Sequence, residues 1–286
     1  MPPKAARFDV TISGASFAGL ALACALCDAL GADFKIALID RVANAAARPD
    51  ARAFALSAAS VHLLQAIGVW QAIAEHAQPV TGIDITDTSL EAGVRPVLLS
   101  YDNSTETGEP ATYIVPVGPL TAALRTKAAS LPSITFFAPA DAVGFTADET
   151  GARINLADGR QIETSLVVAA DGRKSPLREA AGIKVIGWSY AQTGIVTTVR
   201  HDRPHAGRAV QHFLPNGPFA ILPLTGNRAC ITWTEEAREA ARILALDDDG
   251  FLAEVEKRFG GKLGAIALDG PRQSWALELH LARRYV

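Results

Sequence analysis

The residues Phe8-Asp-Val-Thr-Ile-Ser-Gly-Ala-Ser-Phe-Ala-Gly19 decide the fold, because a β-rich run enters a turn of small residues that leads directly into an apolar segment. This order predicts a strand, a phosphate-binding turn and a helix. Gly14 permits a tight turn, the small Ser16 lets the backbone approach a pyrophosphate, and Gly19 lets the helix lie close to the strand. Although Ser16 stands where the standard pattern has its second glycine, the turn predicts a bound dinucleotide.

A second apolar run, Phe34-Lys-Ile-Ala-Leu-Ile-Asp40, strengthens the dinucleotide interpretation. It ends in an acid about twenty residues after the turn, where a carboxylate accepts hydrogen bonds from ribose hydroxyls. We therefore assign Asp40, with the adjacent Arg41, to the cofactor site. The alternative is an ordinary strand–helix–strand unit whose glycines serve packing alone.

The composition is that of a globular protein with one large domain or two interleaved ones. The 286 residues are 49% hydrophobic and 20% charged, and the net charge is −3. The 27 basic residues are scattered along the chain, so we expect no nucleic-acid partner. Three cysteines cannot form a disulfide framework, which favours a reducing cytoplasm. No run reaches the ~18 apolar residues of a membrane-spanning helix, so any membrane contact would be peripheral.

Two features near the N-terminus have a second interpretation. Lys4 and Arg7 before an apolar run imitate a signal peptide, but the glycine turn separates them from that run and Asp28 interrupts it. Cys24 and Cys27 have the spacing of a metal-binding or redox pair. As small apolar residues one helical turn apart they also pack well against a sheet, which is the role we expect.

Two further motifs carry side chains suited to a nucleotide. Arg52 lies among small and apolar residues, and arginine donates two parallel hydrogen bonds to a diphosphate. A solvated arginine at a helix start is the alternative. Asp171-Gly172 follows the buried run Ser165-Leu-Val-Val-Ala-Ala170 and precedes a basic segment. This pair indicates either a second contact with the nucleotide or a simple turn.

The hydrophobic periodicity changes along the chain and predicts an α/β protein with two interleaved domains. Residues 1–75 and 112–180, with a last strand at 276–286, are expected to form a Rossmann-like domain around a parallel sheet. Residues 76–111 and 181–275 alternate short strands with turns, which predicts a mostly antiparallel second domain.

These motifs together resemble the FAD-dependent aromatic hydroxylases, and among them the ubiquinone-biosynthesis hydroxylases. The likeness runs through essentially the whole chain and implies an FAD-binding domain interleaved with a substrate domain, as in para-hydroxybenzoate-hydroxylase-like folds. It rests on the order and spacing of Gly14-Ala-Ser-Phe-Ala-Gly19, Asp50-Ala-Arg-Ala-Phe-Ala-Leu-Ser57, Ala170-Asp-Gly-Arg-Lys-Ser-Pro-Leu-Arg178 and Phe213-Leu-Pro-Asn-Gly-Pro-Phe-Ala-Ile-Leu-Pro-Leu224.

The resemblance implies a role for each residue of the site. The glycine turn would hold the FAD pyrophosphate through backbone amides, and Asp40 would bind the adenosine ribose. Arg52 would lie along the FAD diphosphate, and Asp171-Gly172 would contact the pyrophosphates of both FAD and NAD(P)H.

The activity implied is hydroxylation of an electron-rich phenol, with NAD(P)H as the reductant and O2 as the oxygen source. Because the cofactor carries this chemistry, we assign no catalytic side chain and no metal. His212 in the antiparallel sheet would either contact the phenol or be structural. The expected partners are a polyprenylated aromatic substrate and other ubiquinone-biosynthesis proteins, in the cytoplasm or at the periphery of the inner membrane.

Two other functions fit the same motifs. An FAD-dependent reductase of the geranylgeranyl-reductase kind shares the glycine turn and the Asp-Gly pair, and a non-catalytic nucleotide-binding fragment of a biosynthetic complex would also contain them. In the resembling family, a strand like that ending at Arg284-Tyr-Val286 leads into a second flavin motif and a helix beside the flavin ring. We therefore expect the chain as given to lack its C-terminal flavin segment and to bind FAD weakly.

Overall fold

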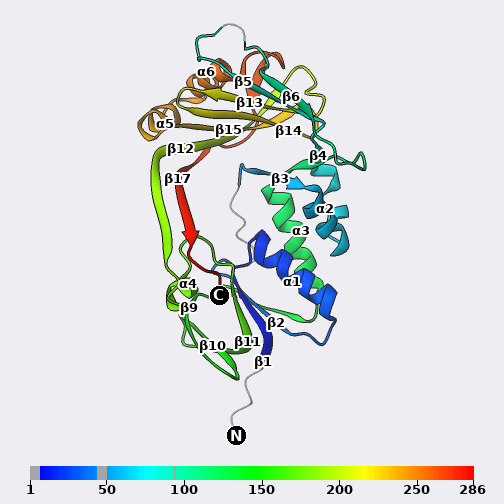
Figure 1. The fold of residues 1–286 in the computed structure, drawn as a ribbon, viewed down its shortest axis with the longest axis vertical. Helices are drawn as coiled ribbons and strands as arrows, with labels where there is room; N and C mark the ends of the chain where they lie inside the picture. Colours follow the sequence, from blue (N-terminus) through cyan, green and yellow to red (C-terminus); the bar gives the residue numbers. More distant parts are fainter. Residues whose placement is uncertain (1–6, 44–49, 93–94) are drawn as a thin grey trace.

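A mainly parallel sheet forms the lower part of the molecule (Figure 1) in the computed structural model, which describes residues 7–43, 50–92 and 95–286. Its strand order is β8 (Ile134–Phe137), β2 (Ile36–Ile39), β1 (Arg7–Ser13), β11 (Gln161–Ala169), β10 (Gly151–Leu156) and β9 (Ala142–Asp148). The first four strands are parallel, and the last two add an antiparallel extension. β1 is buried at most positions, as expected for a central strand covered on both faces.

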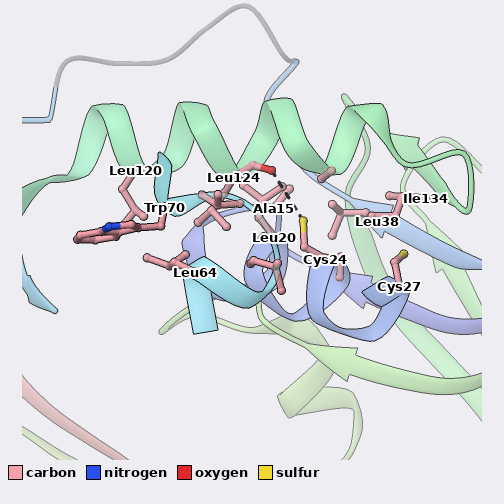
Figure 2. Close-up of a cluster of buried hydrophobic side chains, with 14 of the residues drawn as sticks. Ala15, Leu20, Cys24, Cys27, Leu38, Leu64, Trp70, Leu120, Leu124 and Ile134 are labelled. Carbon is pink, nitrogen blue, oxygen red and sulfur yellow. Dashed lines mark hydrogen bonds between the residues drawn. The ribbon is translucent and has the colours of Figure 1, made fainter. Parts of the chain in front are cut away.

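Helices pack against this sheet through one apolar cluster. The cluster joins α1 (Phe17–Leu30), α2 (Ala58–Ala66) and α3 (Val117–Ser130) to β1 and β2. Figure 2 shows Leu20, Leu38 and Leu124 meeting between these elements. After α2 the chain turns at Gly68 (φ +70°) and continues in the 3-10 turns η1 (Trp70–Ala72) and η2 (Ala74–His76).

The two cysteines of α1 belong to the same cluster (Figure 2). The Cys24 sulfur lies 4.0 Å from the carbonyl oxygen of Leu124, and the Cys27 sulfur lies 3.3 Å from the Ser133 hydroxyl. Burial, and then the neighbouring Cys27, raise the pKa of the Cys24 thiol to about 11. A protonated, enclosed thiol is a poor nucleophile and a poor metal ligand, which favours the packing role.

An antiparallel sheet forms the upper part (Figure 1). Its strand order is β16 (Ile266–Leu268), β12 (Val185–His201), β15 (Arg228–Glu236), β14 (Gly217–Leu224), β13 (Arg208–Leu214), β5 (Gly82–Asp87) and β6 (Leu99–Asp102). Neighbouring strands in this sheet are antiparallel, except β13 and β5, which are parallel to each other. α5 (Ala237–Leu244) and α6 (Asp248–Phe259) cover one face through a second apolar cluster. The opposite face meets the small sheet of β3 (Ala53–Ser57), β7 (Thr112–Pro116) and β4 (Gln78–Pro79).

The last strand is not where we expected it. We expected residues 276–286 to extend the parallel sheet, but β17 (Gln273–Ala282) pairs with β12 instead. The cause is the length of β12, whose 17 residues run from the antiparallel sheet toward the parallel one and pair with β17 over residues 185–189 and 193–196 (Figure 1). Only the residues after β17 return to the parallel sheet, where Tyr285 lines a cavity with Leu166 of β11. We retain the division into two domains as a proposal.

None of the helices in the described part of the chain combines the length and the apolar character needed to cross a membrane.

Candidate functional site

The turn between β1 and α1 is held against two neighbouring strands by very close backbone contacts. The amide of Gly14 donates to the carbonyl oxygen of Ile39, at 2.8 Å. A Cβ on Gly14 would lie 2.2 Å from the carbonyl oxygen of Ala170, and its φ of +107° also disfavours other residues. A Cβ on Gly19 would lie 1.9 Å from the Gly14 carbonyl oxygen. The two glycines therefore bring the turn, the end of β2 and the end of β11 together.

A cavity of about 320 Å³ lies where these three strand ends meet. This is the carboxyl edge of parallel strands, at which open α/β sheets bind their ligands. The structure thus brings together most of the residues selected from the sequence, while Gly19 lies beneath the turn in α1 and Arg52 does not line the cavity. The predicted residues that line it are Gly14, Ser16, Asp40, Arg41, Asp171 and Gly172.

The amino end of α1 opens toward this cavity. Ser16 is the N-cap residue, is exposed, and makes no side-chain capping bond. The first turn of the helix contains no acidic residue that would compensate its positive end. The free amides of the first turn therefore suit an anionic ligand such as a pyrophosphate.

Asp40 sits at the end of β2 and is held by an arginine that we did not select from the sequence. Arg125 of α3 donates through Nη2 to Asp40 Oδ2 at 2.8 Å, and the same nitrogen lies 3.2 Å from the carbonyl oxygen of Ala15. The other carboxylate oxygen accepts from the amide of Val42, at 3.2 Å. Nothing in the local sequence distinguished Arg125 from the other basic residue of α3, Lys127. Arg41 is more exposed and pairs with Asp141 at 2.9 Å.

Asp171 is the feature of the site most in need of a ligand. Both of its carboxylate oxygens are buried, and neither has a hydrogen-bond partner among the described residues. A buried carboxylate without a partner is costly, and such groups in folded proteins are usually satisfied by protein, water or ligand. Gly172 follows with φ +87°, so the backbone turns there without a Cβ entering the open space. These features fit a cofactor whose hydroxyl groups donate to Asp171 and whose phosphates meet the α1 amides.

Arg52 has partners of its own. Its guanidinium pairs with Asp50, with Nη2 2.6 Å from Oδ2, and it lies over the rings of Phe54 and Trp275 at 5.8 Å and 5.1 Å. The hydrogen bonds from Arg52 lower the pKa of Asp50 in spite of its partial burial. The Arg52 guanidinium is thus already paired with a carboxylate, and the role of Arg52 toward FAD stays a prediction.

His212 is enclosed on the face of the antiparallel sheet that α6 covers. Its Nδ1 lies 2.5 Å from the Thr86 hydroxyl, and its ring stacks on Phe219 with centroids 6.3 Å apart. Burial, and then the charge of Arg95, lower its pKa to about 4, so the ring is neutral at pH 7. These contacts favour the structural alternative over contact with a phenol.

Comparisons with known proteins agree with this geometry. Residues 7–285 match a family model described as FAD binding domain. The ubiquinone hydroxylase UbiL of Rhodospirillum rubrum is 41% identical over 278 residues, which cover 97% of this chain and 63% of that protein. The 3-demethoxyubiquinol 3-hydroxylase of Escherichia coli is 28% identical over 263 residues, which cover 90% and 65%. The chain therefore spans less than two thirds of the length of these curated relatives.

Solved structures show the same fold at low identity. The p-nitrophenol 4-monooxygenase PnpA from Pseudomonas putida superposes with a TM-score of 0.75 at 15% identity, over 97% of this chain and 70% of that one. PqsL of Pseudomonas aeruginosa superposes with a TM-score of 0.73 at 20% identity, over 88% and 67%. The predicted fold class is thereby confirmed, and the chain belongs to the FAD binding domain family.

Proposed function

We propose that this chain supplies the nucleotide-binding and substrate-covering parts of an FAD-dependent monooxygenase that hydroxylates a polyprenylated phenol in ubiquinone biosynthesis, with NAD(P)H as the reductant. One observation carries the FAD site: the buried carboxylate of Asp171, which has no partner among the described residues and lies beside the glycine turn. The substrate class is supported by the similarity to the Rhodospirillum rubrum ubiquinone hydroxylase.

The residues at the edge of the parallel sheet would bind and orient the cofactor. The amides at the start of α1 would meet the pyrophosphate, and Asp40, fixed by Arg125, would accept from the adenosine ribose hydroxyls. Asp171-Gly172 would lie at the pyrophosphates of FAD and NAD(P)H, with the carboxylate accepting from hydroxyl groups of the cofactor. When bound, FAD supplies the redox chemistry and the activation of O2 for the hydroxylation.

The antiparallel sheet would cover the substrate and exclude water, and would supply no reactive group. Its face toward the small sheet carries Val196, Ala209 and Cys230, all buried. These side chains pack against the small sheet and so fix the position of the antiparallel sheet, which would cover the phenol and limit access of water to the reacting atoms. We assign no side chain a proton-transfer role.

The proposal is tested by titrating the purified chain with FAD and following flavin fluorescence, then adding NADH or NADPH and a prenylated phenol under O2. We expect weak flavin binding that depends on Asp171, and a product heavier than the substrate by one oxygen atom would identify a hydroxylase. Reduction of a double bond in the tail would instead identify a reductase. Absence of flavin binding would contradict the assignment of the cavity.

A further inference from the structure

A second cavity, of about 340 Å³, lies beside β5, β13 and the end of α6 and shares no lining residue with the proposed FAD site. Its floor is apolar and is formed by Val210, Ile221 and Phe259, which belong to or pack against the cluster under α5 and α6. These side chains lie on the opposite face of the sheet from Val196 and Cys230. The second cavity is therefore separate from the surface that would cover the substrate.

The rim of this cavity is strongly cationic. Arg95, Arg203, Arg208 and Lys262 line it, and Asp84 is the only carboxylate among its described lining residues. Asp84 already accepts from Arg208 at 2.5 Å and from Lys262 at 3.1 Å. These bonds, the one from Arg208 first, hold the pKa of Asp84 well below its usual range. One fixed negative charge is thus shared between two of the cations.

The remaining two cations have no carboxylate partner in the part of the chain that the structure describes. Arg95 donates to the backbone carbonyls of Lys257 and Arg258, and its Nε is buried without a partner among the described residues. Arg203 is exposed and makes no ion pair with a described residue. A buried guanidinium nitrogen beside an apolar floor is a feature that an anion would satisfy.

We propose that this cavity binds a small amphiphilic anion, a molecule with one carboxylate or phosphate group on an apolar body. The anionic group would lie at the rim against Arg95 and Arg203, and the body would lie on the floor near Ile221 and Phe259. The buried Thr86–His212 pair closes the end of the cavity, and because both side chains already bond each other they add little polarity there. The proposal is independent of the function proposed above.

The test uses three probes that separate the two halves of the proposed ligand: octanoate, the neutral 1-octanol, and acetate. Calorimetric titration of the chain should give a Kd for octanoate of about 1 mM or tighter, with octanol and acetate at least about tenfold weaker. Octyl phosphate in place of octanoate then distinguishes a phosphate from a carboxylate as the preferred group.

Two variants leave the core of the sheet intact. Arg203→Gln removes an exposed charge and should weaken octanoate binding about fivefold or more, and Val97→Trp places a large side chain at the exposed mouth and should abolish it. Arg238→Gln is the matched control, since it removes an exposed charge on α5 that does not line the cavity. Equal affinity for octanol and octanoate, no binding of octanoate, or binding that survives Val97→Trp would each overturn the proposal.

Discussion

At the scale of single residues, Asp171 illustrates how a group can be unfavourable to the free protein and favourable to a complex. Its carboxylate oxygens are buried and without partners among the described residues, and the residue lines the cavity at the glycine turn. Removing the carboxylate should therefore change stability and binding in opposite directions.

We expect Asp171→Ala to stabilise the ligand-free chain by about 1 kcal/mol, because an unsatisfied buried acceptor disappears. The same variant should raise the Kd for FAD by about tenfold or more, because a charge-assisted hydrogen bond is lost. Urea unfolding and flavin fluorescence measure the two effects. Asp158→Ala, in an exposed turn, is the control and should leave FAD binding unchanged. Destabilisation of the free chain by Asp171→Ala would show that the carboxylate has a structural partner.

Arg52 gives a second prediction at this scale. If it contacts the diphosphate, Arg52→Ala should weaken FAD binding about tenfold, because a bidentate donor is lost. Arg153→Ala is a suitable control, since Arg153 also forms an ion pair, at 2.9 Å from Glu163, but lies away from the cavity. Equal dissociation constants for the two variants would remove Arg52 from the cofactor site and leave it as the partner of Asp50.

At the scale of elements, the strand–turn–helix unit depends on space as well as on backbone angle. Gly14 and Gly159 both have positive φ, at +107° and +86°. A Cβ on Gly14 would clash with Ala170, whereas a Cβ on Gly159 would meet no atom within 4 Å. Replacing each by alanine therefore separates the steric clash from the cost of the backbone conformation alone.

Gly159→Ala should cost about 1 kcal/mol of unfolding free energy, as expected for an unfavourable backbone conformation. Gly14→Ala should cost several times more, because β1 and β11 must also move apart, and it should abolish detectable FAD binding. Chemical denaturation and flavin titration of both variants provide the comparison. A similar loss of stability in both would mean that the contact with Ala170 relaxes without cost.

The ion pairs of Glu254 within α6 and with Arg242 of α5 predict how stability depends on pH. Burial alone would raise the pKa of Glu254, but hydrogen bonds from Arg258, Arg242 and Lys257 outweigh it and lower the pKa to about 2. Because the folded pKa lies below the ordinary value of 4.5, this stabilisation is complete above pH 4.5 and is lost as the pH falls toward 2.

Glu254→Gln should therefore cost about 3 kcal/mol at pH 7, since it leaves Arg258 short of one buried partner, and should flatten the loss of stability between pH 4.5 and 2. The exposed Glu256 on the same helix provides the control variant, Glu256→Gln. Measuring the unfolding free energy of both variants across this pH range tests the prediction. If the unfolding free energy of Glu254→Gln still falls between pH 4.5 and 2 as steeply as that of the unmodified chain, other carboxylates cause the acid sensitivity.

At the scale of the whole molecule, the two main apolar clusters share no residue. One contains Trp70 and the other contains Trp233, which lies between Phe219 and Phe251. Regions with separate cores can unfold with different free energies.

Phe251→Ala removes a fully buried ring from the upper cluster and should cost about 3–5 kcal/mol there. In variants that keep only one tryptophan each, the urea midpoint reported by Trp233 should fall more than the midpoint reported by Trp70. Coincident midpoints would show that the long strand β12 couples the two parts into a single transition.

The sequence predicted those features of the fold and the site that depend on residues close together in the chain. The glycine turn and Asp40 were selected from spacing and Asp171 from the resemblance to the aromatic hydroxylases, and the structure brings the three to one cavity. The sequence did not predict that Arg125 pairs with Asp40 or that β17 pairs with β12. Each pairing joins segments roughly 85 residues apart, and no local pattern in either segment identifies the other as its partner. Contacts of this kind are decided by how the packed elements meet.

The buried thiols can report local opening of the protein, because each becomes accessible to a reagent only when its surroundings open. Burial raises the pKa of Cys230 to about 11, and its sulfur lies 3.6 Å from the carbonyl oxygen of Ala51, at the seam between the antiparallel sheet and the segment that carries Arg52. An alkylating reagent can modify this cysteine only while the seam is apart, whereas Cys24 requires α1 and α3 to separate. The Cys230 modification rate would therefore report how often this seam opens, and the Cys24 rate how often α1 separates from α3, without any engineered label.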